Sequence, residues 1–475
     1  MEVMQRHGSM LNNMPELPEV ETVKNILIPL IVGKIIEKVD VIYDRLITSD
    51  LNTFKNELKN KKIEKITRHG KYLFFHLSSS LVLIVHLRME GKFRYISNSS
   101  YRNKHATAIF YFSDGTGLSF DDTRKFAVMH LSNETEYKKL PMIAKLGLEP
   151  FDVNTSNINS IIEKFNRKKT VKELLLDQTI LCGIGNIYAD ETLYLSRIHP
   201  LTLGKDLSQN DIKLLVDNSR ITLQKAVGLG GTTIHSFHPS EGVDGKFQEK
   251  LLCYGKKGEI CPLCESTFHK FFVGGRGTTF CPNCQIDHNL EKAIGLTGPI
   301  GSGKSAALEV FKANNYLVIS SDEEVHELYR LPEVRSKLRK IVGFDFNYDD
   351  EESKEKLKAK LITSPQTKVN LENYIYPLVE ERLIKYIREN PLVCIEVPLL
   401  FKAHFEYLFK KIIVIKIDKK KQVENLVTRG TNKDIALKLN NDYSYKDIKK
   451  VITVENSNDL LTFKSKIQNI INKLD

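Results

Sequence analysis

Long apolar runs are missing from this chain of 475 residues. The longest apolar stretches, 81–85 and 412–415, are too short to span a membrane, and we expect them to be buried strands. Residues 1–13 lack the apolar core of a secretory signal peptide. The seven cysteines are odd in number and form no dense framework, which argues against a secreted disulfide scaffold. We therefore expect a cytoplasmic protein without a membrane partner.

The charge of the chain is moderately positive. Its formal net charge of +11 fits a polyanionic partner such as nucleic acid. A lysine-rich surface that reflects compositional bias alone would give the same charge, so charge does not decide between the two. The length suggests about two to four domains, each long enough for its own core.

The hydrophobic pattern divides the chain into regions of different structure. After the polar residues 1–13, residues 14–150 open with a helical pattern and continue as strand-like runs, which predict an antiparallel β-sandwich. These runs are 35–42, 63–67, 72–77, 81–87, 108–112 and 127–131. Residues 151–250 are expected to be a helical domain, with helices at 158–165, 171–176, 187–197 and 211–227. A cysteine-bearing hairpin follows at 251–287, and residues 293–475 alternate strands and helices as a parallel α/β domain.

Four cysteines form two C-x-x-C pairs that are separated by sixteen residues: Cys261, Cys264, Cys281 and Cys284. Two such pairs can close a tetrahedral thiolate site for one zinc ion. Two disulfides or four unrelated thiols are the alternatives. Because all four positions are cysteine, no coordination position is left for water or substrate, so the zinc should be structural. The remaining cysteines, at 182, 253 and 394, lie in apolar contexts and are expected in the core.

The residues between the two cysteine pairs include an arginine among glycines, Arg276 in the segment 273–278. An arginine on a glycine-rich tip suits a phosphate or a nucleic-acid groove. A solvated loop arginine is an equally good interpretation of the local sequence.

Residues 298–305 fit the phosphate-binding pattern G-x-x-x-x-G-K-[ST]. An expected strand at 293–297 precedes the pattern and an expected helix at 306–313 follows it, which is the context that the pattern requires. Backbone amides of such a loop hold phosphates, the lysine reaches the β- and γ-phosphates, and the last hydroxyl can bind Mg²⁺. A chance match is the alternative. The predicted ATP-binding residues are Gly298, Gly301, Ser302, Gly303, Lys304 and Ser305.

The stretch 14–23, MPELPEVETV, can be interpreted simply as a helix entry with prolines and acidic residues in the first turn. It also resembles the mature start of the formamidopyrimidine-DNA glycosylases. Further segments of 14–285 resemble that family in the expected order, at 68–73, 86–91, 104–105, 122–126, 183–191, 230–233 with 244–248, and in the cysteine hairpin. Departures from its pattern occur after His105 and at Lys125 and Ala127.

The resemblance implies a bifunctional glycosylase and abasic-site lyase that removes oxidised purines such as 8-oxoguanine from double-stranded DNA. It implies Pro15 as nucleophile, Glu16 as acid and base, Lys71 for β-elimination and Arg276 for δ-elimination. It also implies DNA contacts by Met89, His105, Arg124, Phe126, Lys168 and Asn186. Without the resemblance, Met89 and Phe126 would be assigned to the core, and the others would be ordinary surface residues. A module that binds damage without cutting is the alternative function.

The chemistry sets a condition on the start of the chain. A proline inside the chain has a tertiary amide nitrogen, whose lone pair is delocalised into the preceding carbonyl and cannot attack a sugar carbon. We therefore expect residues 1–13 and Met14 to be absent from the mature protein, with Pro15 as its first residue.

Residues 293–474 resemble dephospho-coenzyme A kinase. The resemblance is carried by 294–305, by 318–322 with His326, by 396–401, by Arg429 and by 455–456. It implies transfer of phosphate from ATP, with Mg²⁺, to dephospho-coenzyme A, and Asp322 is the remaining candidate for the catalytic acidic residue. Ser320, Tyr376, Lys402, Asn425 and Leu439 depart from the family pattern. The alternatives are another small hydroxyl substrate and a nucleotide-binding domain whose kinase activity is weakened or lost through these departures. We expect a monomer.

Overall fold

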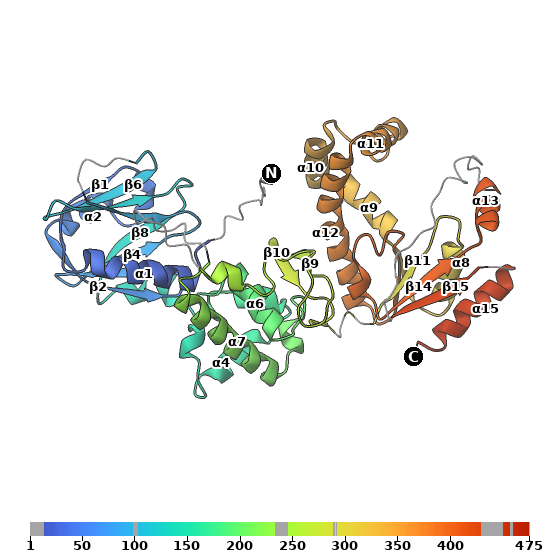
Figure 1. Ribbon diagram of the computed structural model, residues 1–475, viewed down its shortest axis with the longest axis horizontal. Coiled ribbons are helices and arrows are strands. Elements are labelled where there is room, and N and C mark those ends of the chain that lie inside the picture. The colour runs from blue at the N-terminus through green and yellow to red at the C-terminus, as the bar shows by residue number, and fades with distance from the viewer. Residues whose placement is uncertain are drawn as a thin grey trace, which may run out of the picture. The chain divides into compact units, whose positions relative to one another are not determined.

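A computed structural model describes residues 14–97, 103–232, 246–287, 290, 292–428, 450–456 and 459–474. The chain separates into two compact units, Met1–Ile286 and Asp287–Asp475 (Figure 1). Five residues quoted from the sequence motifs lie outside the described residues, as do residues 1–13: Thr233, Asp244, Gly245, Arg429 and Leu439. No described helix is both long and apolar enough to cross a membrane.

The first unit begins with helix α1 (Leu17–Ile31). Pro18 stands in its first turn, where a missing N–H costs nothing, and Glu16 and Glu19 form a capping box around the free amides. Val20, Val23 and Leu27 recur at helical spacing and are fully buried. The helix predicted from this periodicity is therefore present.

Eight antiparallel strands follow, in the order β5-β7-β6-β1-β2-β3-β4-β8. They are β1 (Ile35–Val41), β2 (Lys61–His69), β3 (Tyr72–Leu77), β4 (Leu81–His86), β5 (Lys92–Ile96), β6 (Ala106–Phe112), β7 (Gly117–Asp121) and β8 (Val128–Asn133). Helix α2 (Leu51–Leu58) lies between β1 and β2 in the chain. The predicted antiparallel sheet is confirmed. The strands β5 and β7 were not predicted, because each is five residues long and mixes charged or small residues with its apolar ones.

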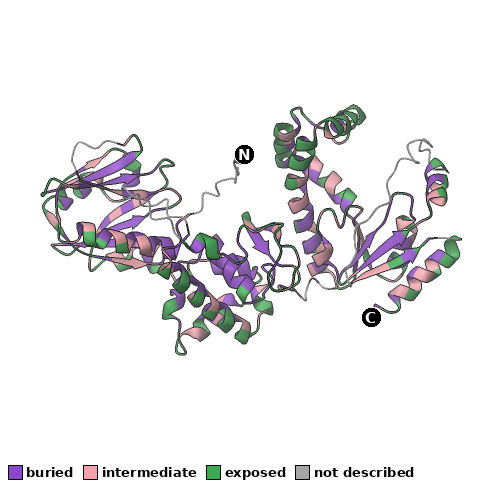
Figure 2. Ribbon diagram, in the orientation of Figure 1, coloured by how far each residue is buried: buried purple, intermediate pink, exposed green. Residues whose placement is uncertain are grey.

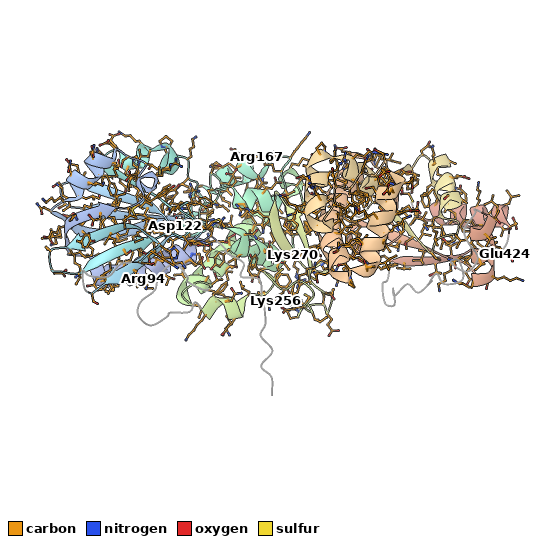
Figure 3. All side chains as sticks on the ribbon, turned by 90° about the horizontal axis from the view of Figure 1, so that it is seen from above. Arg94, Asp122, Arg167, Lys256, Lys270 and Glu424 are labelled. Atoms are coloured by element: carbon orange, nitrogen blue, oxygen red, sulfur yellow. The ribbon has the colours of Figure 1, made fainter. Side chains whose placement is uncertain are left out.

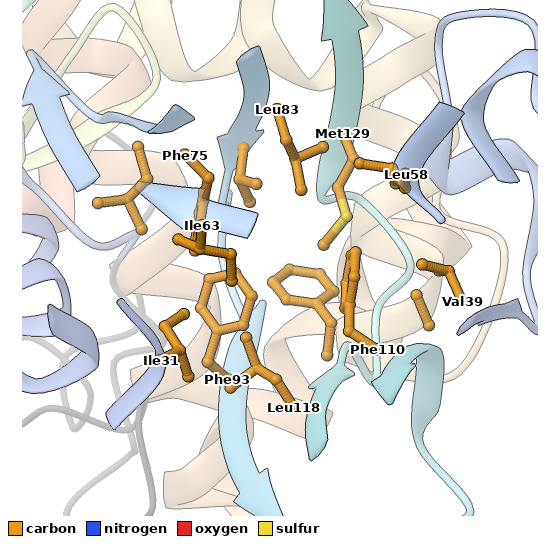
Figure 4. Close-up of a cluster of buried hydrophobic side chains, with 14 of the residues drawn as sticks. Ile31, Val39, Leu58, Ile63, Phe75, Leu83, Phe93, Phe110, Leu118 and Met129 are labelled. Atoms are coloured by element: carbon orange, nitrogen blue, oxygen red, sulfur yellow. The ribbon is translucent and has the colours of Figure 1, made fainter. Parts of the chain in front are cut away.

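The sheet folds over itself and closes one core (Figure 4). The ring of Phe75 on β3 lies 5.6 Å, centroid to centroid, from that of Phe93 on β5, although these strands stand far apart in the strand order. Phe110, Leu118 and Met129 join the same cluster. Side chains from distant strands therefore pack face to face, as in a sandwich.

The helical part of this unit contains α4 (Ile158–Phe165), α5 (Val171–Leu176), α6 (Asn186–Leu195) and α7 (Gln209–Gly228), whereas the short helix α3 (Pro141–Ala144) packs against the sheet through Ile143. Helices α4 and α5 have the predicted bounds. Capping boxes at Thr170 and Ser208 fix the starts of α5 and α7. The cysteine hairpin pairs β9 (His269–Val273) with β10 (Arg276–Phe280).

The second unit is built on a parallel sheet in the order β12-β13-β11-β14-β15. Its strands are β11 (Ile294–Thr297), β12 (Leu317–Ser320), β13 (Val393–Glu396), β14 (Lys411–Lys416) and β15 (Val451–Glu455). Its described helices are α8 (Lys304–Ala313), α9 (Ser321–Arg330), α10 (Pro332–Val342), α11 (Glu351–Thr363), α12 (Pro365–Glu389), α13 (Lys419–Thr428) and α15 (Leu460–Ile471). The predicted parallel α/β domain is confirmed.

The strands and helices of this unit do not alternate one for one, since only a short 3-10 turn (Glu406–Leu408) stands between β13 and β14. Four helices, α9 to α12, stand between β12 and β13, and α11 is exposed over most of its length (Figure 2). Strand β11 occupies the centre of the sheet, so the glycine-rich turn after Thr297 emerges at the carboxyl edge between two neighbouring strands. Ligands of open parallel sheets bind at this edge.

Candidate active sites

Glu16 stands at the junction of the sandwich with the helical part. Its carboxylate accepts the amide of Gly185 at 2.5 Å and that of Ile187 at 2.9 Å, both at the start of α6. The positive end of a helix stabilises such a charge. A side chain at position 185 would place its Cβ 2.3 Å from the Glu16 Cδ, so the close approach requires glycine there.

Burial has a large effect on the acidity of Glu16, whose side chain is 2% exposed. Desolvation is the main cause that raises its pKa to about 7, and the negative charge of Glu19 adds to it. The Lys71 ammonium and the amides of Ile187 and Gly185 lower the pKa in part. The carboxyl group can therefore both hold and release a proton near neutral pH.

Lys71 is the second buried ionisable group of this site. Its Nζ donates to the carbonyl oxygen of Ile184 at 2.9 Å, one residue before the amide that holds Glu16. Burial lowers its pKa, the charges of Glu16 and Glu19 oppose the shift, and the charge of Arg276 adds to it. The structure thus brings Glu16 and Arg276 each within electrostatic reach of Lys71.

Pro15 is buried directly before Glu16. Leu17, the residue after Glu16, donates its backbone amide to the carbonyl of Gly183 at 3.0 Å. Gly183 has φ +95°, and a Cβ there would lie 2.6 Å from the Leu17 side chain. The segment 15–17 is therefore held against the turn 183–187 by backbone contacts, which places Pro15 beside the buried carboxylate.

Glu19 is a residue of this site to which the sequence assigned no role. It accepts hydrogen bonds from the Tyr188 hydroxyl at 2.7 Å, the Thr232 amide at 2.8 Å and the Glu16 amide at 3.0 Å. It therefore ties the start of α1 to α6 and to the turn at 230–232. The only signal in the sequence was its position in the quoted opening motif.

The loop at 122–127 presents two of the predicted DNA contacts to solvent. The Asp122 carboxylate, labelled in Figure 3, accepts the amides of Arg124, Phe126 and Ala127 at 2.8–3.0 Å. Phe126 is 54% exposed, and the Arg124 guanidinium lies 5.0 Å from its ring centroid. The alternative that Phe126 belongs to the core is therefore wrong.

Met89 lies half-buried in the turn after β4. That turn contacts the 122–127 loop, because the Thr123 hydroxyl donates to the Glu90 carboxylate. His105 is exposed, and its carbonyl accepts the Asp122 amide at 3.0 Å. The structure thus groups Met89 and His105 with the loop that carries Arg124 and Phe126.

Lys168 and Asn186 lie on other elements. Lys168 is exposed in the segment before α5. Asn186 opens α6, and its Nδ2 donates to the carbonyl of Gly277 in the cysteine hairpin at 2.9 Å. Asn186 therefore connects α6 to the hairpin that carries Arg276.

The four paired cysteines converge. Their Sγ atoms all lie within 4.8 Å of one another. Cys264 and Cys281 are 3.4 Å apart and Cys261 and Cys284 are 3.8 Å apart, measured between Sγ atoms. Disulfide sulfurs would be about 2.05 Å apart, so the disulfide alternative does not fit. Zn–S bonds of about 2.3 Å in a tetrahedron place sulfurs about 3.8 Å apart, so the quartet fits one structural zinc.

A buried ion pair attaches this hairpin to α6. The Asp190 carboxylate pairs with Lys172, both fully buried, and its second oxygen accepts the Thr279 amide at 2.9 Å. Asp190 lay in the quoted motif at 183–191 without a role, and Lys172 had no sequence signal. A further group of possible metal ligands contains His69, Glu149 and Cys182. The Glu149 carboxylate of this group already accepts hydrogen bonds from the Arg68 guanidinium and the Gly70 amide.

The glycine-rich loop of the second unit has the geometry of a phosphate cradle. Gly298, Gly301 and Gly303 have φ of 153°, 79° and 101°, and a Cβ on Gly303 would lie 2.5 Å from the Asn456 Nδ2. The Asn456 side-chain Nδ2 donates to the carbonyl of Ser302 at 2.8 Å. The Ser302 hydroxyl is buried and has no hydrogen-bond partner among the described residues.

Lys304 begins α8 and folds back over this loop. Its Nζ donates to the carbonyls of Gly298 at 3.0 Å and Pro299 at 3.2 Å. It also lies 3.7 Å from the Glu396 carboxylate at the end of β13. Ser305 is exposed in the first turn of α8. The lysine and the backbone of the glycine-rich loop suit a polyphosphate with Mg²⁺.

Asp322 is exposed in the first turn of α9, beside the same carboxyl edge. Its negative charge raises the pKa of Glu396, although burial is the larger cause and Lys304 opposes it. No sequence pattern singled out Glu396 as a site residue beyond its place in the segment 396–401.

Two of the departures from the kinase pattern, Lys402 and Asn425, have polar partners in the fold. Lys402 pairs with Glu372 at 2.5 Å, and the charge of Glu372 raises the pKa of Tyr376, for which burial is the main cause. Asn425 donates to the carbonyl of Gly301 at 3.0 Å and so supports the phosphate loop.

The matches to known families fall within the same two units of the chain. The formamidopyrimidine-DNA glycosylase N-terminal domain matches residues 14–129, the H2TH domain of the same glycosylase matches 146–238, and the zinc finger found in FPG and IleRS matches 258–286. The dephospho-CoA kinase family matches residues 292–460.

Curated relatives and solved structures match the first unit. The formamidopyrimidine-DNA glycosylases of Lactobacillus gasseri and Halalkalibacterium halodurans are each 44% identical over 276 residues, which cover 58% and 57% of this chain and 99% and 100% of theirs. The Lactococcus lactis Fpg in complex with abasic-site DNA has a TM-score of 0.53 at 39% identity, with 57% of this chain and 100% of that chain covered. Because the relatives are matched over nearly their whole length, the chain belongs to the formamidopyrimidine-DNA glycosylase family, and its second unit adds a dephospho-CoA kinase domain.

Proposed function

We propose that the first unit removes oxidised purines, such as 8-oxoguanine and formamidopyrimidines, from double-stranded DNA and then cleaves the abasic strand. The observation that carries the proposal is the buried Glu16 carboxyl group, with a pKa raised to about 7, beside Pro15 and Lys71. A group of this acidity can exchange protons with a substrate at neutral pH. The choice of substrate is supported by a relative named formamidopyrimidine-DNA glycosylase and by similar solved structures in complex with Fapy-dG- and 8-oxo-G-containing DNA.

Pro15 is the proposed nucleophile. A free secondary amine can attack the sugar C1′, expel the damaged base and leave an iminium ion. The positive charge acidifies the C2′ protons, so strand cleavage by β-elimination follows, and δ-elimination completes it. We assign proton transfer to Glu16, support of β-elimination to Lys71 and support of δ-elimination to Arg276. All of this requires that residues 1–13 and Met14 are removed or never translated, and the family match that begins at residue 14 supports that start.

DNA binding is assigned to the loops that the structure groups on the sandwich and to two residues of the helical part. Met89 and Phe126 would enter the base stack, and Arg124 would contact the base left without a partner. His105, Lys168 and Asn186 would bind phosphates, which position the duplex without reading its sequence. The exposure of Arg124 and Phe126 supports this assignment.

Borohydride trapping on duplex DNA that contains 8-oxoguanine tests the proposal. The form that starts at Pro15 should give a covalent protein–DNA adduct, because borohydride reduces the iminium to a stable amine. Glu16→Gln should reduce base release while DNA binding persists. If the Pro15 form binds the lesion but neither traps nor cuts, the alternative of a damage-binding module is correct.

We further propose that the second unit binds ATP with Mg²⁺ and phosphorylates dephospho-coenzyme A. The phosphate loop with its folded-back Lys304 carries the proposal. Lys304, Ser302 and the loop glycines would hold the phosphates, Ser305 would contact the metal ion, and Asp322 would accept the proton of the ribose hydroxyl.

The test is conversion of dephospho-coenzyme A to coenzyme A by the purified chain. Lys304→Ala should lower turnover at least about 100-fold, because it removes a charge aimed at the transferred phosphoryl group. Base excision by the same preparation is the control and should not change. If the wild-type chain binds ATP but yields no coenzyme A, another hydroxyl compound is the substrate.

A further inference from the structure

One face of α6 holds the cysteine hairpin at three places (Figure 1). Asn186, Asp190 and Tyr194 follow one another at intervals of four residues, so their side chains lie on the same side of the helix. The first two hydrogen-bond to the backbone of β10, at 2.9 Å each. The hydroxyl of Tyr194 lies 3.2 Å from the Sγ of Cys261. The helix therefore contacts both a strand of the hairpin and one of the four paired cysteines.

Tyr194 is buried, with 2% of its surface exposed. It belongs to the apolar cluster that contains Cys253, Cys261, Phe268 and Cys281, and its ring packs edge-on against that of Phe268 at 5.4 Å between centroids. A phenol hydroxyl that is buried without a hydrogen-bond partner is costly. In this structure the sulfur of Cys261 is the partner of the hydroxyl.

The direction of this hydrogen bond depends on the state of Cys261. A thiol carries a proton, so either atom can donate to the other. A cysteine that binds a metal ion is a thiolate and has no proton, so the Tyr194 hydroxyl must then be the donor. A hydrogen bond to a charged acceptor is roughly twice as strong as one between neutral groups. Tyr194 therefore favours the metal-binding state of Cys261 over the thiol.

Two other cysteines of the quartet have donors within the hairpin. The Sγ of Cys281 accepts the backbone amide of Cys284 at 3.4 Å, and the Sγ of Cys264 lies 2.9 Å from the hydroxyl of Ser266. Ser266 is half-buried, so water can take the place of its hydroxyl. Tyr194 differs from both donors because it is buried and belongs to α6. Its hydrogen bond therefore connects the metal-binding residues to the rest of the unit.

We propose that Tyr194 is a positioning residue of the zinc site, whose hydroxyl donates to the Cys261 thiolate, raises the affinity of the four cysteines for zinc and fixes the metal-bound hairpin against α6. The inference rests on the assignment of a structural zinc and is independent of base excision. Because Asn186 and Asp190 hold β10 on the same face of α6, a firmly attached hairpin also helps to fix Arg276, the first residue of β10.

The first test is the zinc affinity of Tyr194→Phe, which removes the hydroxyl and keeps the ring that packs against Phe268. The affinity should fall about 10- to 100-fold, because loss of a partner that hydrogen-bonds to a metal ligand has effects of this size. Competition of the full chain with a chromophoric chelator measures it. Ser219→Ala is the matched control and should keep the wild-type affinity, since it removes a buried hydroxyl that bonds to a carbonyl within α7.

A second readout separates the hydrogen bond from packing of the ring. Cobalt(II) can replace zinc in a thiolate site, and its sulfur-to-metal charge-transfer absorption depends on the electron density of the sulfurs. Tyr194→Phe should move this absorption to longer wavelength, because a thiolate that loses a hydrogen bond gives up an electron more easily. Ser266→Ala should move it less, because water can replace a half-buried hydroxyl.

Each outcome of these measurements decides for or against the proposal. An unchanged cobalt spectrum in Tyr194→Phe would overturn it even if the variant is less stable, because the side chain would then act only by packing. Equal losses of zinc affinity in Tyr194→Phe and Ser219→Ala would overturn it in favour of a general destabilisation of the helices. If the wild-type chain binds neither metal, the assignment of a structural zinc fails as well. If the wild type binds both metals and Tyr194→Phe is indistinguishable from it, only the role of Tyr194 fails.

Discussion

The two candidate sites differ in how far they are assembled before a substrate arrives. In the first unit, Glu16 and Lys71 are buried and each is held by backbone groups at the start of α6. In the second unit, Asp322 and Ser305 are exposed, and Lys304 binds the carbonyls of its own loop. A site that must stabilise an unusual protonation state needs low solvent exposure, whereas a site for a polyphosphate can recruit its charges when the ligand binds.

The largest expected effect concerns the amine of Pro15, the proposed nucleophile of the first unit. Expression from Met1 without processing should abolish borohydride trapping, because the Pro15 nitrogen is then an amide, while damaged DNA can still bind. Expression from Met14, with removal of that methionine, should restore trapping. Coenzyme A formation should be the same in both forms. Equal trapping by the long and short forms would exclude Pro15 as nucleophile and point to a lysine such as Lys71.

Loss of the zinc should weaken DNA binding by the first unit and leave the second unit intact. Cys281→Ser removes one of four converging thiols, and structural zinc contributes about 10 kcal/mol or more to the folding of such a finger. Gel-shift affinity for lesion DNA should fall at least about 100-fold, because Arg276 loses its support. Cys394→Ser, in the core of the other unit, is the control for a lost thiol. Zinc-free wild-type protein with full DNA affinity would contradict the prediction.

The protonation of Glu16 should make the stability of the first unit depend on pH. The pKa of Glu16 is about 7 in the folded state and has an ordinary value of 4.5, so the folded state binds the proton more tightly than the unfolded state. The stability that this tighter binding adds is lost as the pH rises. Between pH 4.5 and pH 7 the free energy of unfolding of the wild type should fall by up to about 3 kcal/mol relative to that of Glu16→Gln. Urea unfolding of both proteins at pH 5 and pH 8 measures it. A stability difference that is the same at both pH values would count against the raised pKa.

The smallest expected effect is that of Phe126→Ala. The ring is 54% exposed, so its removal should leave thermal unfolding unchanged. Affinity for lesion-containing duplex should fall about tenfold, since stacking of an aromatic ring on a base contributes about 1–3 kcal/mol. Filter binding with damaged and undamaged duplexes measures the change. Ile42→Ala, at a residue 59% exposed in the same unit, is the matched control.

The sequence by itself determined the elements whose signals are local. Helical spacing in 17–31 and 158–165, apolar runs in 72–77 and 81–86, and the flanking strand and helix of the phosphate loop were sufficient, because periodicity and capping act within a few residues. The cysteine pairs likewise predicted their own convergence, since thiolates at this spacing have few other uses. Resemblance to known families then supplied residues such as Lys71 and Asn186, for which no local pattern exists.

Only the tertiary structure decided how distant residues share one environment. It placed Glu19 among Tyr188, Thr232 and Glu16, and it put Glu396 beside Lys304 across two strands. It also showed that Phe126 faces solvent, although an aromatic side chain of this kind suits a hydrophobic core. These outcomes depend on strand order, on burial and on contacts between residues far apart in the chain. No short sequence pattern encodes them, because pKa shifts and exposure arise from the surrounding fold.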